Sequence, residues 1–173
     1  ATLDPDFLPA RTMAAHAHIS MALHRYAPPK QVAERTREVC DAILSSIAAG
    51  NPHRFRVVNM SLGGYFDDVK PPDPGSCDAQ APDYKAAFDL LAQAGVLVVA
   101  ASGNGGCTTG VVVPACLSGT LVVSAVYDGA VGTRAFGAGQ CTPSGCVDAT
   151  TAADRIPCYS DSGDRLDVLA PAD

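Results

Sequence analysis

The sequence predicts an α/β fold in which a doubly wound, mostly parallel sheet carries helices on both faces. Segments rich in apolar and β-branched residues alternate along the chain with segments of helical periodicity. The central segment, VLVVAA at 96–101, is apolar without interruption, which is typical of a parallel strand covered on both faces. The strand, helix, strand, helix, strand order favours the doubly wound class.

The first half of the chain contributes a strand, a helix and a second strand. Residues 13–26 predict a strand after a start that contains proline. Pro28-Pro29 opens a helix whose apolar residues recur at spacings of seven, four and four, and Gly50-Asn51-Pro52 ends it. The β-branched run FRVVNM at 55–60 then predicts a strand, followed by SLGG and a loop rich in Pro and Asp.

The second half repeats this pattern. Apolar side chains at i, i+3, i+4 and i+7 predict an amphipathic helix that stops at Gly95; they are Tyr84, Ala87, Phe88 and Leu91. Buried strands are expected at 96–101 and 121–127, and the final strand at LDVLAP, 166–171. Asp128-Gly129 predicts a hairpin that returns the chain into AVGTRAFG.

Composition excludes several classes of protein. With 173 residues the chain fits one domain or the larger part of one. No run of 18 apolar residues is present, so we expect no membrane span. The net charge of −6 and the scattered basic residues argue against a nucleic-acid partner and against a membrane-surface patch. The N-terminus shows no signal-peptide pattern.

The cysteines indicate an oxidising compartment, and hence a secreted or otherwise extracytoplasmic protein. Six of the seven lie between 77 and 158 in segments rich in Gly, Pro, Ser and Thr, where disulfides between loops are common. A zinc site is the alternative, but no C-x2-C pair occurs. Cys40, in the first helix, is expected to be unpaired. The six others are Cys77, Cys107, Cys116, Cys141, Cys146 and Cys158.

Fifteen pairings of six cysteines are formally open. Cys107 and Cys116 flank a short loop, so we predict that they are bonded to each other. A second local disulfide is expected within the cluster Cys141, Cys146 and Cys158.

Three histidines in the first predicted strand could suggest a metal site. His16 and His18 would share a strand face, with His24 further along. No third ligand lies next to that pair, and histidines at the edge of a core are far commoner. We therefore assign no metal to them.

Polar groups follow two of the buried strands, where ligands bind in parallel α/β sheets. These segments are NMSLGG at 59–64 and ASGNGG at 101–106. They could be ordinary turns. A dinucleotide site is excluded because Thr108 stands where the glycine fingerprint requires a third glycine.

Four blocks in this order resemble the catalytic domain of subtilisin-like serine proteases: VVNMSLGG, GVLVVAASGNGG, LVVSAVYDGAVGTRAF and LDVLAP. The resemblance covers about residues 30–172 and implies a serine endopeptidase with a triad of Asp, His and Ser. It places the chain between the catalytic histidine and the catalytic serine. Residues 1–173 are thus expected to form one partial, incomplete subtilisin-like domain.

The chain departs from the family pattern at the triad itself. The family's H-G-T-H and G-T-S-M-A segments have no counterpart in residues 1–173. We expect the isolated chain to be inactive, and to associate with itself or with the missing segments of the same protease. A non-catalytic peptide-binding module or pseudoprotease is the alternative.

The resemblance also implies the binding residues. Asn104 matches the asparagine of the family's oxyanion hole, which donates a hydrogen bond to the tetrahedral transition state. Ser61, Leu62, Gly63 and Gly64 match the segment that pairs with an extended polypeptide substrate and forms one wall of its specificity pocket. The opposite wall is matched by Ala101, Ser102 and Gly103.

No cofactor is required for the chemistry that the resemblance implies. Some members of the family bind a structural calcium ion. Asp167 matches a carboxylate that binds the ion together with carbonyl groups near Ser118 and Thr120. The alternative for Asp167 is a strand-end aspartate that pairs locally or faces water.

Overall fold

The computed structural model describes residues 41–50, 56–64 and 77–172. They belong to two compact units, 1–55 and 56–173. In the first unit residues 41–48 are helical, which confirms the last part of the helix expected up to Gly50. The predicted strand at 13–26, with its three histidines, and Cys40 lie outside the described residues. A single domain over 1–173 stays a prediction.

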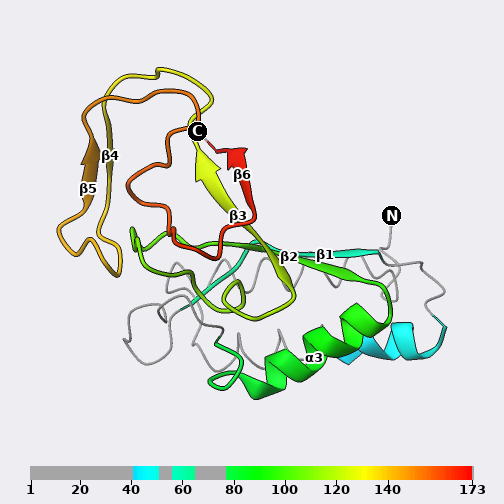
Figure 1. Cartoon of the computed structure of the whole chain (residues 1–173). Coiled ribbons are helices and arrows are strands. Elements are labelled where there is room, and N and C mark those ends of the chain that lie inside the picture. Colours follow the sequence, from blue (N-terminus) through cyan, green and yellow to red (C-terminus); the bar gives the residue numbers. More distant parts are fainter. Residues whose placement is uncertain (1–40, 51–55, 65–76, 173) are drawn as a thin grey trace, which may run out of the picture. The chain divides into compact units, whose positions relative to one another are not determined.

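A parallel sheet forms the centre of the second unit (Figure 1). Its four strands stand in the order β1-β2-β3-β6, and each neighbouring pair is parallel. This confirms the α/β class and the strands expected from the apolar runs. Because all four strands run in one direction, their carboxyl ends meet at one edge of the sheet. The strands are β1 (Val57–Met60), β2 (Leu97–Ala101), β3 (Thr120–Val126) and β6 (Val168–Pro171).

Helix α3 (Pro82–Gln93) precedes β2 and packs against it. Pro82 opens the helix, where its missing N–H leaves no hydrogen bond unmade. Phe88 and Leu91 are buried, as the predicted apolar stripe requires. The chain leaves the helix at Gly95, whose φ of +70° is accessible to glycine at little cost. The predicted second helix is therefore confirmed.

Burial alternates along β2 although its sequence is uniformly apolar. Val98 and Ala100 are buried, whereas Leu97 is exposed and Val99 is half-buried. The expectation that both faces of this strand are covered is therefore wrong for the second unit taken by itself. The less buried side chains Val99 and Ala101 line the pocket described below.

The predicted hairpin after Asp128-Gly129 is also wrong. Strand β4 (Arg134–Phe136) pairs in antiparallel fashion with β5 (Cys146–Asp148) and not with β3. Both edges of β3 are already occupied by β2 and β6. The segment after the turn therefore finds its hydrogen bonds in a separate two-stranded sheet.

All six cysteines of the second unit form disulfides. Cys146–Cys158 confirms the second local disulfide. The predicted Cys107–Cys116 bond is wrong, because Cys107 bonds Cys141 and Cys116 bonds Cys77. Backbone hydrogen bonds explain the observed disulfide pairing. The Cys77 N–H donates to the Cys116 carbonyl at 3.2 Å, and the Cys141 N–H donates to the Gly105 carbonyl at 2.9 Å.

A buried aspartate organises the region beside β4 and β5. Asp148 Oδ2 accepts hydrogen bonds from the Tyr127 hydroxyl at 2.9 Å and the Cys158 N–H at 2.8 Å. Arg155 lies 3.4 Å from its other oxygen. Burial of the phenol and its hydrogen bond to Asp148 raise the pKa of Tyr127 to about 12. Tyr127 therefore stays neutral at physiological pH.

Within the described ranges, the structure contains no helix that is both long and apolar enough to span a bilayer.

Candidate functional site

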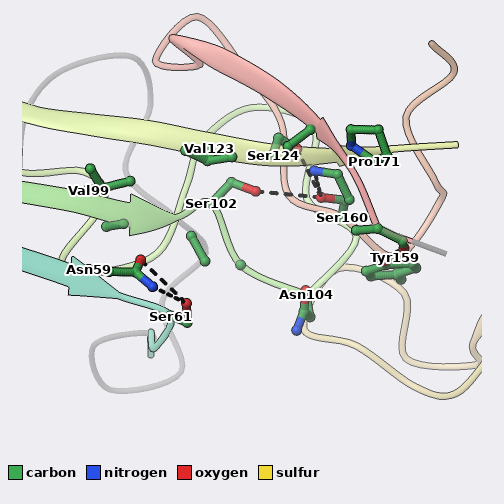
Figure 2. A pocket seen from close by; sticks show the side chains of 16 residues that line it. Asn59, Ser61, Val99, Ser102, Asn104, Val123, Ser124, Tyr159, Ser160 and Pro171 are labelled. Atoms are coloured by element: carbon green, nitrogen blue, oxygen red, sulfur yellow. Dashed lines mark hydrogen bonds between the residues drawn. The ribbon is translucent and has the colours of Figure 1, made fainter. Parts of the chain in front are cut away.

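A pocket of about 400 Å³ lies at the carboxyl ends of the parallel strands. All four strands contribute to its lining, together with the segment at 159–160 (Figure 2). Of the predicted site residues, the structure brings Ser61, Ala101, Ser102, Gly103 and Asn104 together around this pocket. Leu62, Gly63, Gly64 and Asp167 are not part of its lining.

The segment at 61–64 is tied to the chain at both ends. The Asn59 side-chain amide donates to Ser61 Oγ at 3.2 Å (Figure 2). At the other end, Gly64 and Val113 exchange two backbone hydrogen bonds of 3.0 and 3.1 Å. The N–H of Gly64 is thus already used within the chain. Backbone groups of Ser61, Leu62 and Gly63 remain as the stretch to which an extended peptide could add.

Two glycines of the site differ in the space around them. A side chain at Gly63 would collide with Val112, whose Cβ would stand 3.2 Å away. A side chain at Gly64 would meet no atom of the described residues within 4 Å. The backbone of Gly63 therefore packs closely on Val112, whereas no side chain in the described part of the chain packs on Gly64.

The segment after β2 turns sharply at Gly103, whose φ is +117°. A Cβ there would overlap the carboxylate of Asp161 and stand 2.6 Å from Val112 Cγ1. Only glycine therefore fits this position, for reasons of backbone conformation and of space. Asn104 follows with its side chain exposed at the edge of the pocket (Figure 2).

Ser102 belongs to a buried cluster of hydroxyl groups. Its Oγ lies 3.5 Å from Ser160 Oγ, which in turn lies 2.9 Å from Ser124 Oγ (Figure 2). The Ser124 hydroxyl also donates to the Asp161 carbonyl at 3.1 Å. Because these hydroxyls are buried and bonded to one another, Ser102 presents no free polar group to the pocket.

Sequence reasoning missed Asp161, which is fully buried next to the Asn104 turn. Its Oδ1 accepts the N–H groups of Gly105 and Cys107, both at 2.9 Å. The only signal was a charged residue within the otherwise small and polar sequence SDSG, a few residues before LDVLAP. Nothing in that local pattern shows a contact across 56 positions.

The surroundings of Asp167 are those of a residue held by strand pairing. Its carboxylate Oδ2 accepts the Val122 N–H at 2.8 Å, and its own N–H donates to the Val122 carbonyl. Ser118 donates from its N–H and its hydroxyl to Asp78. The described residues contain no group of three or more His, Cys, Asp or Glu side chains that could hold a metal ion. The calcium site stays a prediction.

Comparison with known proteins gives a family and several solved structures. The sequence model of the subtilase family matches residues 15–173. None of the curated proteins matches the chain.

Three similar solved structures are proteases, and each is much longer than this chain. The prenylagaramide maturation protease PagA is 22% identical with a TM-score of 0.45, over 76% of this chain and 36% of that one. The leader peptidase NisP from Lactococcus lactis is 20% identical with a TM-score of 0.46, over 78% and 36%. A protease from Pseudoalteromonas arctica is 24% identical with a TM-score of 0.41, over 67% and 24%.

The chain thus spans about a third or less of the length of these structures. The family match, by contrast, extends over nearly all of its residues, and the parallel sheet agrees with it. The chain belongs to the subtilase family of serine peptidases.

Proposed function

We propose that this chain supplies the oxyanion hole and the substrate-binding strands of a subtilisin-type serine endopeptidase. The observation that carries the proposal is the position of Asn104. It is exposed on a turn at the carboxyl end of β2, beside a pocket that all four parallel strands line. The turn is fixed on either side, by Gly103 and by the N–H groups of Gly105 and Cys107.

The chemistry of an amide side chain suits this role. Asn104 is a neutral donor, so it binds developing negative charge without a proton transfer. A donor aimed at the oxygen that becomes charged strengthens its bond chiefly in the transition state, and so lowers the barrier. Loss of such a donor costs about 2.7–4 kcal/mol, a magnitude that comes from subtilisin itself, a member of this family, and not from this chain.

The substrate is an extended polypeptide. Ser61, Leu62 and Gly63 form one wall, and main-chain hydrogen bonds to this wall hold a peptide regardless of its sequence. The segment from Ala101 to Gly103 forms the other wall by packing, since backbone groups of Ser102 and Gly103 are already bonded within the chain. Gly64 extends the first wall, and its backbone is bonded to Val113. Small residues on both walls leave room for sizeable apolar side chains of the substrate.

The nucleophile and the base come from outside residues 1–173, and the isolated chain is inactive. Without its missing segments the chain associates with itself through apolar residues of the sheet such as Leu97 and Leu169, which are exposed in the second unit. A serine-reactive fluorophosphonate probe separates the two functions. Labelling of the complete protein supports a peptidase, and failure to label supports a non-catalytic peptide-binding protein.

Two further properties belong to this proposal. The three disulfides support export to an oxidising compartment.

A structural calcium ion would use Asp167, whose carboxylate is the hard oxygen ligand that calcium prefers. Chelation should then lower the Tm of the complete protein, and Asp167→Asn should remove that response. An equal response in both proteins would assign the ion to another site.

The decisive experiment exchanges the donor of Asn104 for an apolar side chain. In the complete protease, Asn104→Leu should lower kcat about a hundredfold or more with little change in KM, because the lost bond forms in the transition state. Gln93→Leu, which makes a similar exchange on the exposed face of α3, is the matched control and should leave kcat unchanged. A folded Asn104→Leu variant with kcat within about threefold of normal would contradict the role.

A further inference from the structure

Asp161 combines complete burial with direct contacts to the turn that carries Asn104. Its Oδ1 accepts the N–H of Gly105, the residue after Asn104, and the N–H of Cys107. Its own N–H donates to the carbonyl of Gly103, the residue before Asn104, at 2.9 Å. One aspartate therefore binds the backbone on both sides of the proposed oxyanion donor.

The neighbours of Asp161 extend this contact along the whole turn. The Gly106 N–H donates to the Tyr159 carbonyl at 2.8 Å, and the Ser162 N–H donates to the Cys107 carbonyl at 2.7 Å. The N–H groups of the three residues that follow Asn104 therefore all point toward the 159–161 segment. The turn is shaped by a segment that lies more than 50 residues away in the sequence.

The carboxylate is also fitted to the shape of the turn. The space that a Cβ would occupy at Gly103 is taken by Asp161 Oδ2 and by Val112. Glycine at 103 and aspartate at 161 are therefore complementary, since the missing side chain of one makes room for the other. A carboxylate oxygen that accepts two backbone N–H groups also forms stronger hydrogen bonds than a neutral acceptor would.

We propose that Asp161 is the positioning residue of the oxyanion hole: it fixes the backbone of 103–107 so that the Asn104 amide is presented to the substrate before the substrate arrives. This inference rests on the proposed function of Asn104 and deepens it. Asp161 itself does not touch the substrate and acts only through Asn104. Its contribution is preorganisation, because a donor that is held in place need not be ordered during the reaction.

A double-mutant cycle in the complete protease tests this inference. Asp161→Ala should lower kcat about tenfold to a hundredfold and change KM by less than about twofold, because a displaced donor is lost mainly in the transition state. Asp161→Asn keeps the shape and one acceptor oxygen, and should retain kcat within about threefold. In the Asn104→Leu background, Asp161→Ala should cause no further loss of kcat, because the donor that it positions is gone.

Asp148 supplies the matched control. It is also a buried aspartate that accepts a backbone N–H, but its partners lie beside β5. Asp148→Ala should leave kcat per folded molecule unchanged. If Asp161→Ala does not fold, Asp161→Ser replaces it in the cycle, since its short hydroxyl lacks the reach of the carboxylate.

Two results would overturn the inference alone: a normal kcat for Asp161→Ala, or an equal loss of kcat with and without the Asn104 amide. Both can be recognised while Asn104→Leu by itself is still strongly impaired. A normal kcat for Asn104→Leu would instead overturn the proposed function, and the positioning role with it. An additive loss in the cycle would assign Asp161 a purely structural role.

Discussion

Two buried aspartates in the second unit each accept at least one backbone N–H group but serve different parts of the molecule. Asp148 binds a phenol, a backbone N–H and the guanidinium of Arg155, and so joins β5 to the end of β3 and to the Cys158 segment. Asp161 binds the backbone on both sides of Asn104. A buried carboxylate alone therefore does not mark an active site. What matters is whether the groups that it fixes include one that reaches the substrate.

Each of these two aspartates lies near a disulfide. Cys146–Cys158 closes the region of Asp148, and Cys107–Cys141 closes the turn held by Asp161. Replacing both cysteines by alanine should lower the free energy of unfolding by about 3 kcal/mol for the first disulfide and about 4 kcal/mol for the second, whose loop is longer. Denaturant titration of the two double variants measures these losses.

Only removal of Cys107–Cys141 should also lower kcat per folded molecule, because only this disulfide holds the oxyanion turn. Equal kcat values for the two double variants would break the proposed distinction between the regions.

The next effect concerns Asp148 itself. Asp148→Ala leaves the Tyr127 hydroxyl and the Cys158 N–H without their acceptor, and should lower the free energy of unfolding by about 3 kcal/mol. Urea unfolding of the complete protein measures the loss. A change below about 1 kcal/mol would mean that water replaces the lost partners and that the Asp148 region is not a rigid support.

The two glycines of the substrate wall provide a smaller effect. Gly63→Ala forces a methyl group against Val112 and should cost about 1–3 kcal/mol of stability while raising KM, because the wall must move. Gly64→Ala meets no atom of the described residues and should change KM by less than about twofold. Peptide kinetics on both variants test this pair. A larger rise of KM for Gly64→Ala would show that the substrate contacts Gly64 directly.

The smallest expected effect is a dependence of stability on alkaline pH. The pKa of Tyr127 is raised from 10.0 to about 12 in the folded chain, so folding is favoured while the phenol stays protonated. The unfolded chain loses this proton first, and the resulting stability is therefore present below pH 10 and is lost as the pH rises toward 12.

Tyr127→Phe cannot ionise, so the stability difference between parent and variant should shrink over this interval. Thermal melts at a series of pH values measure it. A constant difference would show that Tyr127 ionises equally in both states.

Much of the sheet could be predicted because the central parallel strands have sequences that are almost continuously apolar. VLVVAA and LVVSAVY became β2 and β3, and the periodic residues Phe88 and Leu91 became the buried side of α3. The rule that ligands bind at the carboxyl ends of parallel strands also located Ser61 and Asn104 at one pocket.

What could not be predicted depends on contacts between distant segments. The Cys107–Cys116 prediction failed because closeness along the chain was taken for closeness in space. The backbone instead brings Cys77 next to Cys116 and Cys141 next to Gly105. Asp161 escaped notice for the same reason: a single aspartate in a polar segment carries no local periodicity. The partner of β4 depended on which edges of the main sheet were still free.

The most direct test of the account compares a transition-state analogue with its inert counterpart in the complete protease. A peptide aldehyde adds to a nucleophilic serine and places an oxygen in the oxyanion hole, whereas the corresponding peptide alcohol does not. Asn104→Leu should weaken the aldehyde about a hundredfold and leave the Kd of the alcohol unchanged, because only the adduct contains the charged oxygen. Equal affinity of parent and variant for the aldehyde would contradict the assignment of Asn104 to the oxyanion hole.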